Sequence, residues 1–133
     1  MKNSKVEICF IGNAIVDILS KISNKTLNKL KIPKGSMQLV DEESSDKILK
    51  YIKDPSIISG GSAANTAVGF KSFGGTCSFI GQIGNDKFGD LFSKDLNNSG
   101  VFFQDKDFQL SEKTSKSIVL VTPDAERSMN TFL

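Results

Sequence analysis

The sequence predicts an α/β fold in which a central, mostly parallel sheet is flanked by helices. Residues 6–12 (VEICFIG) form a nearly continuous apolar run, as in strands that are buried on both faces of a parallel sheet. Residues 57–89 then read as strand, glycine pair, helix, glycine pair, strand and glycine turn. With 133 residues, of which 38% are apolar, the chain can bury about two-thirds of its unfolded surface as a single domain, residues 1–133.

Composition excludes several classes of protein. The net charge is +2 and the lysines are scattered, so no footprint for nucleic acid stands out. No run approaches the ~18 apolar residues of a membrane span, and no signal peptide precedes the first strand. Cys9 and Cys77 lie in apolar runs and histidine is absent, which argues against zinc or a disulfide scaffold. We expect reduced, packed thiols and a cytoplasmic location.

The first strand, residues 6–12, is predicted to be central. Asp17 is the single acid of residues 14–22, and we expect it just beyond the carboxyl end of that strand. Ligands of open α/β sheets bind at that end. By spacing alone, a solvated loop acid or a turn cap fits Asp17 equally well.

The segment up to residue 53 is predicted to form a short helix, a short strand and a second helix. Ser23 or Asn24 is expected to cap a short helix that runs through Lys31, with its leucines inward. Residues 37–40 are expected to form a short strand. Residues 41–53 carry acids in the first turn and lysine in the last, which favours a scaffold helix.

The glycine-flanked helix is the candidate for ligand contact. Gly60 and Gly61 end a strand, and residues 62–73 then follow helical spacing until the next glycine pair. The apolar face of this helix is expected to hold Ala63, Ala67, Phe70 and Phe73. Its first N–H groups are unpaired beside a backbone without side chains, and Asn65 can face the same space.

The sequence from residue 86 onward predicts a helix, a short strand, a polar loop and a hairpin. Residues 86–97 form an amphipathic helix that ends at Gly100 and holds Phe88, Leu91, Phe92 and Leu96 on one face. Residues 101–103 read as a short strand and residues 105–116 as a polar loop. Residues 117–122 and 127–133 read as a hairpin.

These motifs are similar to one known family. The pattern Gly60-Gly61-x-x-x-Asn65, a second glycine pair, and Phe79-Ile80-Gly81-x-x-Gly84-x-Asp86-x-x-Gly89 resembles the N-terminal signature of the pfkB (ribokinase-like) family. Gly12-Asn13-x-x-x-Asp17 is similar to its first-strand motif in the adenosine-kinase-like branch. A βα unit of another α/β protein would explain one glycine pair, but not the whole series of motifs.

The resemblance implies a ribokinase-like, Rossmann-type sandwich with a small β-sheet lid over the substrate, truncated at Leu133. Lid strands are expected within about 14–22, 36–40 and 117–133. By resemblance Asp17 accepts hydrogen bonds from neighbouring sugar hydroxyls, each worth ~1.5–3 kcal/mol. The other implied substrate-binding residues are Asn13, Gly60, Gly61, Asn65, Met37 and Leu39. For Met37 or Leu39 taken singly, core packing remains the stronger alternative.

The turn at residues 122–127 is similar to the family's Thr-Pro-Asp-Gly-x-Arg, but Ala125 replaces the glycine. If this position needs a positive φ, alanine costs on the order of 1 kcal/mol. The resemblance implies that Arg127 lies near the phosphates or the lid hinge. A surface arginine of the hairpin fits equally well.

The resemblance implies ATP-dependent phosphorylation of a hydroxyl group on a nucleoside or a sugar, with ATP and Mg²⁺ as cofactors. The family's general base is an aspartate in a Gly-Ala-Gly-Asp motif, which these residues lack, so we expect it beyond Leu133. No catalytic or metal-binding residue is therefore assigned. We expect the chain to be an N-terminal substrate-binding part, inactive alone, that could form a homodimer through the lid or an exposed sheet edge.

Two other functions stay open at this stage. One is a non-catalytic module that binds a sugar or a nucleoside, which an ATP-consumption assay distinguishes from a kinase. The other is a dinucleotide-dependent oxidoreductase. The sequence from Gly60 to Asn65 weakens that reading, because it does not fit G-x-G-x-x-G.

Overall fold

The computed structural model describes residues 5–104 and 109–133, with only the backbone described at 109 and 110. The chain divides into two compact units. Unit 1 comprises Met1–Val16 and Ile58–Ser115, and unit 2 comprises Asp17–Ile57 and Lys116–Leu133. Helices and strands alternate along the chain, which confirms the α/β class. In the described ranges, no helix is both long and apolar enough to cross a membrane.

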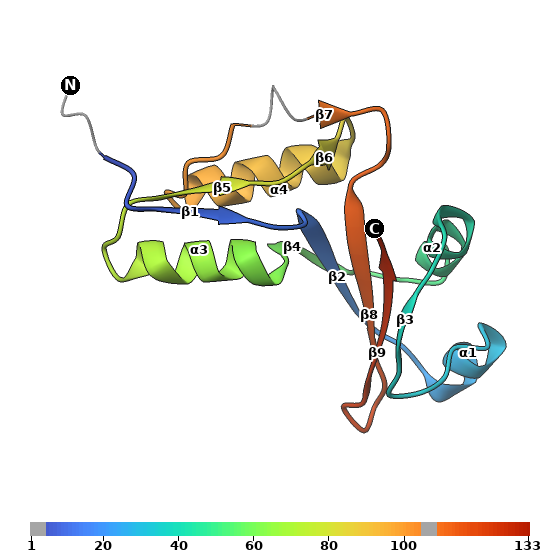
Figure 1. Ribbon diagram of the computed structural model, residues 1–133. Coiled ribbons are helices and arrows are strands. Elements are labelled where there is room, and N and C mark those ends of the chain that lie inside the picture. Colours follow the sequence, from blue (N-terminus) through green and yellow to red (C-terminus); the bar gives the residue numbers. More distant parts are fainter. Residues whose placement is uncertain (1–4, 105–108) are drawn as a thin grey trace. The chain divides into compact units, whose positions relative to one another are not determined.

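Unit 1 is built on a parallel pair of strands. β1 (Ile8–Ile11) pairs with β5 (Cys77–Ile80), so that Ile8 lies opposite Cys77. On the other side of β5, Phe102 bridges to Ser78. Helix α3 (Ser62–Ser72) packs along both strands (Figure 1). The strand, glycine, helix and strand order read from the sequence is therefore present.

The prediction that β1 is a buried central strand is wrong for this structure. Ile8 is exposed and Ile11 is 73% exposed. Among the described residues β1 pairs with β5 alone. Parallel strands normally have neighbours and covered faces, and here one edge and parts of both faces of β1 meet solvent.

Helix α3 ends as the glycine pair predicts. The N–H of Gly74 donates to the carbonyl of Lys71, and the N–H of Gly75 donates to that of Phe70, while Gly74 has a φ of +93°. This is the Schellman arrangement that closes many helices. The predicted apolar face needs correction, because Ala64 and Ala67 are buried whereas Phe73 is 93% exposed. Phe73 is the cap residue beyond the last turn, so helical spacing does not carry it inward.

The rest of unit 1 packs around aromatic rings. Helix α4 (Lys87–Asn98) buries Phe92 and Leu96, which confirms the predicted amphipathic helix. The rings of Phe79, Phe92 and Phe103 have centroids 5.5 to 5.8 Å apart. β6 (Ile83–Gly84) pairs in parallel with β7 (Gln109–Leu110), a pairing that the sequence did not predict. The expected loop at 105–116 lies partly outside the described residues.

The thiols of unit 1 differ from each other. Cys77 is buried, its Sγ donates to the carbonyl of Ala67 at 3.4 Å, and burial raises the pKa of its thiol. Cys9 is exposed, so the expectation of a packed thiol is wrong there, although neither cysteine forms a disulfide.

Unit 2 carries most of a five-stranded sheet with the order β3-β9-β8-β2-β4. The unit division falls within β2 and β4 and after the first residue of β8. The strands are β2 (Ile15–Lys21), β3 (Met37–Leu39), β4 (Ser56–Gly60), β8 (Ser115–Val121) and β9 (Arg127–Phe132). β8 and β9 form the predicted antiparallel hairpin, and β3 joins β9 in parallel (Figure 1).

One face of this sheet forms the core of unit 2. Ile18, Ile118 and Leu120 are fully buried. Helices α1 (Asn24–Lys29) and α2 (Glu42–Leu49) contribute buried Leu27 and Ile48, and α2 packs against β9. Ser23 and Asp41 cap these helices through side-chain oxygens, so both are stabilised at the predicted starts.

Candidate functional site

Gly61 brings the end of β4 close to the segment that follows β1. It precedes α3 and has a φ of +93°, a conformation that favours glycine. A Cβ at Gly61 would lie 2.7 Å from the backbone oxygen of Asn13. Likewise, a Cβ at Gly12 would lie 2.7 Å from the Cβ of Ala63. The glycines of both motifs therefore allow β1, β4 and the first turn of α3 to meet.

The N-terminus of α3 differs from those of the other three helices. Ser23, Asp41 and Asp86 cap α1, α2 and α4 with side-chain oxygens, whereas no side chain caps α3. The first helical bond runs from the N–H of Asn65 to the carbonyl of Gly61, at 2.9 Å. The side chains of Asn13 and Asn65 are both exposed. Unit 1 thus gathers Asn13, Gly60, Gly61 and Asn65 around one helix start, whose amides suit an oxygen-rich ligand.

Asp17 follows the end of β1 and lies inside β2, in unit 2, so the alternative of a loop acid is wrong. The strand alternates, so Val16 and Ile18 are buried while Asp17 is half-buried on the less buried face. Burial raises the pKa of Asp17 above its ordinary value of 3.8. A carboxyl group that is partly desolvated gains from any hydroxyl that donates to it.

Three further predicted residues share one face of the sheet of unit 2. Met37 lies opposite Met129, and Arg127 lies two residues before Met129 on the same strand. Because alternate residues of a strand share a face, Met37, Leu39, Arg127 and Met129 project together. We call these four residues the open face. Met37 is 62% and Leu39 67% exposed, so the core-packing alternative is wrong for both.

The hairpin turn next to Arg127 is held by an ion pair. Lys34 Nζ donates to Asp124 Oδ2 at 2.5 Å, and Thr122 Oγ1 donates to Asp124 Oδ1 at 2.7 Å. The hydrogen bond from Lys34, followed by that from Thr122, lowers the pKa of Asp124 to about 2. Ala125 has a φ of +66°, so the left-handed conformation anticipated at this position is present.

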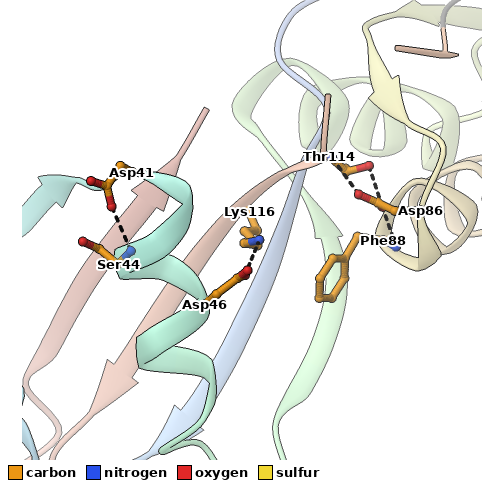
Figure 2. A network of polar contacts seen from close by, with 7 residues as sticks. All are labelled: Asp41, Ser44, Asp46, Asp86, Phe88, Thr114 and Lys116. Carbon is orange, nitrogen blue, oxygen red and sulfur yellow. Dashed lines mark hydrogen bonds and ion pairs between the residues drawn. The ribbon is translucent and has the colours of Figure 1, made fainter. Parts of the chain in front are cut away.

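The Gly84-x-Asp86-x-x-Gly89 motif forms a clamp within unit 1 (Figure 2). Asp86 Oδ1 accepts from the N–H groups of Phe88 and Gly89 and from Thr114 Oγ1, and Oδ2 accepts from the N–H of Thr114, all at 2.9 to 3.0 Å. A Cβ at Gly84 would meet the carbonyl of Glu112, and one at Gly89 would meet the carbonyl of Gly84. This part of the signature therefore has a structural role.

The pKa of Asp86 reflects two opposing effects. Burial alone would raise it, but the hydrogen bonds from Thr114, Gly89 and Phe88 outweigh burial, and the pKa lies below 3.8. Sequence reasoning missed Thr114, because no local pattern links it to an acid 28 residues earlier.

A buried lysine in unit 2 also escaped sequence reasoning. Lys116 is 1% exposed, and its Nζ lies 3.4 Å from Asp46 Oδ1 (Figure 2). The same Nζ lies 5.0 Å from the centre of the Phe132 ring. Among the described residues, no group of three His, Cys, Asp or Glu side chains could hold a metal ion.

Comparison with known proteins finds a matching family and similar folds. The family described as "pfkB family carbohydrate kinase" matches residues 35–133. The adenosine kinase structure from Sinorhizobium meliloti is 38% identical, with a TM-score of 0.82 over 98% of this chain and 40% of that one. A probable sugar kinase from Rhizobium etli CFN 42 is 34% identical, with a TM-score of 0.77 over 96% of this chain and 39% of that one.

Curated relatives match a shorter stretch. The Escherichia coli fructokinase is 39% identical over 74 residues, which are 56% of this chain and 24% of that protein. Probable fructokinase-4 from Arabidopsis thaliana is 32% identical over 77 residues, which are 58% of this chain and 22% of that protein. The chain thus spans about two fifths of the two related structures and about a quarter of these fructokinases. The fold is ribokinase-like, and the chain belongs to the pfkB family of carbohydrate kinases.

Proposed function

We propose that this chain supplies the substrate-binding part of a kinase that transfers a phosphoryl group from ATP to a hydroxyl group of a nucleoside or a sugar. The observation that carries the proposal is the meeting of Asn13 with the uncapped, glycine-led start of α3. Family membership supplies the reaction class. In that role the strands of unit 2 act as the lid expected from the sequence.

Each predicted residue has a chemical task in this proposal. Asp17 accepts hydrogen bonds from substrate hydroxyls, and Asn65 and the amides of α3 bind substrate oxygens. The open face shields the substrate from water, and Arg127 lies near the transferred phosphate. Phosphoryl transfer depends largely on such positioning and on charge neutralisation. ATP and Mg²⁺ supply the phosphoryl group and the neutralising charge.

The open face favours a nucleoside over a free sugar as the substrate. Met37, Leu39 and Met129 present an apolar surface with one cation, Arg127, beside it. A planar base has apolar faces that fit such a surface, whereas a free sugar has hydroxyls all around that need polar partners. The similarity to the adenosine kinase supports the same choice, and the fructokinases keep the sugar as the second substrate to test.

Asp17→Asn tests the proposal. Loss of two charge-assisted hydrogen bonds is expected to weaken binding by ~3–5 kcal/mol, a hundredfold to a few-thousandfold. The stability of the folded protein, in contrast to substrate affinity, is not expected to fall in Asp17→Asn. A carboxyl group whose folded pKa is raised favours folding below pH 3.8 and loses that contribution as the pH rises through the folded pKa, so the variant should equal or exceed the wild type in stability at pH 7.

The measurement is calorimetric titration with adenosine, ribose and fructose, together with thermal unfolding at pH 7. Asp95→Asn is the control, since Asp95 accepts from the N–H of Ser59 within unit 1 and has no proposed substrate contact. Unchanged affinity in Asp17→Asn would leave Asp17 as a strand residue without a binding role.

A non-catalytic binding module remains the second candidate, because these 133 residues contain no Gly-Ala-Gly-Asp motif. An ATP-consumption assay across the same three compounds distinguishes the two functions. Binding without substrate-dependent ADP production by the chain supports a module or an incomplete enzyme. ADP production by the pure chain would show that the catalytic groups are already present.

A further inference from the structure

β3 is a strand whose apolar residues do not determine its register. It has three residues, and in the described part of the chain it pairs with β9 alone. Met37 and Leu39 are exposed, so a slip of two residues along β9 would keep every side chain on its present face and uncover no core. The backbone bonds, from Met129 N to Ser36 O and from Val40 N to Thr131 O, would find equivalent partners after such a slip.

Gln38 is the residue of β3 that distinguishes one register from another. It lies directly opposite Asn130, and its Nε2 donates to Asn130 Oδ1 at 2.7 Å. Asn130 is fully buried, with Ile118 on its other side. In a slipped register the amide oxygen of Asn130 would lose its donor in a place that water does not reach. Leaving a buried acceptor unpaired is costly, so the correct register is selected.

The stability of the fold does not explain why position 130 is an asparagine. Its Nδ2 is buried and has no hydrogen-bond partner within the described structure. The side chain therefore satisfies one polar group and leaves another without a partner. An apolar residue of similar size would avoid that cost, and a buried polar group that is kept despite it is best explained by specificity.

We propose that the hydrogen bond between Gln38 and Asn130 fixes the register of β3 and thereby positions Met37 and Leu39 for the substrate. The claim that this bond fixes the register depends only on contacts within unit 2. The claim that it positions Met37 and Leu39 for the substrate rests on the proposed function. A slip by two residues would move Met37 from Met129 to a place opposite Arg127 or Thr131, and the open face would change shape. Gln38 and Asn130 are thus positioning residues that do not themselves touch the substrate.

Asn130→Leu separates register from stability. The midpoint of thermal unfolding is expected to stay the same or to rise, because the unpaired amide is removed. The nuclear Overhauser contacts between the backbones of Met37 and Met129 should weaken, and contacts of a second register should appear. Calorimetry should show adenosine affinity reduced by about tenfold or more. Gln38→Leu, at a half-buried position, should give the same register and affinity results if Asn130→Leu fails to fold, but with a lower unfolding midpoint, because it leaves the buried Oδ1 of Asn130 without its donor.

Thr131→Val is the matched control. It removes the 3.3 Å bond from Thr131 Oγ1 to Ser117 Oγ, which joins β9 to β8, where the hairpin already sets the register. This variant should keep the contacts between Met37 and Met129. A single native register in both leucine variants would overturn the proposal. A lost register with unchanged adenosine affinity would overturn its second half.

Wild-type protein that binds none of the nucleosides or sugars would instead refute the proposed function and, with it, the substrate half of the inference. The backbone contacts of Met37 and Met129 would then still decide the first half.

Discussion

Gly61 meets two separate requirements at one backbone position. Its φ of +93° disfavours every other residue, and the oxygen of Asn13 occupies the space that a Cβ would need. Gly61→Ala is therefore expected to lower the free energy of unfolding by about 1–3 kcal/mol, whether or not a ligand binds nearby. A loss of ligand binding in that variant would not show direct contact, so Asn65 is the better probe.

Asn65→Ala is expected to weaken substrate binding without lowering stability. The side chain is exposed in α3, and alanine is the better helix former by about 0.5 kcal/mol. Titration with adenosine and thermal unfolding measure the two effects. Thr66→Ala, at the neighbouring exposed position, is the control and should bind like the wild type. Equal affinity in both variants would remove Asn65 from the site.

Ala125→Gly is expected to stabilise the hairpin. Ala125 has a φ of +66°, and glycine adopts this conformation without steric cost. The gain should reach up to about 1 kcal/mol, since the greater freedom of glycine in the unfolded chain offsets part of it. Urea unfolding of the two proteins gives the difference. Ala14→Gly, at a buried position without positive φ, should have the opposite sign.

At the scale of elements, the clamp of Asp86 ties the start of α4 to the chain just before β8. Asp86→Ala removes an N-cap and both bonds to Thr114, and should cost about 2–4 kcal/mol. Thr114→Val, which keeps the backbone bond to Asp86, should cost less. Asp41→Ala, which removes one cap bond of α2, is the control and should lose less than Asp86→Ala.

The clamp also predicts a dependence on pH. The folded pKa of Asp86 is lowered, so its stabilisation is complete above its unfolded value, 3.8, and is lost as the pH falls through the folded pKa. The difference in unfolding free energy between the wild type and Asp86→Ala should therefore shrink below about pH 3.8. A constant difference from pH 7 to pH 2 would contradict the contribution of the carboxylate.

At the scale of the whole molecule, the open edge of β1 predicts self-association. Ile8 and Ile11 are exposed on a strand that pairs on one side among the described residues, and such edges recruit further strands. Ile11→Lys should reduce association, measured by light scattering over a concentration series. Phe73→Lys removes a still more exposed apolar side chain outside any strand, and should reduce association less. A wild-type monomer at high concentration would show that the edge is protected.

The sequence predicted those features that depend on local chemistry. Glycine pairs, capping residues and alternation located α3, α4 and the β8–β9 hairpin. The spacing alone left a loop acid open for Asp17, because glycine and asparagine precede it, whereas the chain resumes a strand at Ile15. Thr114 and Lys116 could not be predicted, since their partners are 28 and 70 residues away and no periodicity encodes such pairs. The exposure of β1 depends on which strands lie beside it, and its own apolar pattern carries no information about that.

The strand order has a consequence for synthesis on the ribosome. β3 has its described partner in β9, and Gln38 is separated from Asn130 by 92 residues. At about 5–20 residues per second, Gln38 is made roughly 5 to 18 seconds before Asn130. For that interval Met37 and Leu39 belong to an unpaired segment, and α2 and β4 are made early within it. The nascent chain is thus open to chaperones and to wrong strand partners until β9 has emerged.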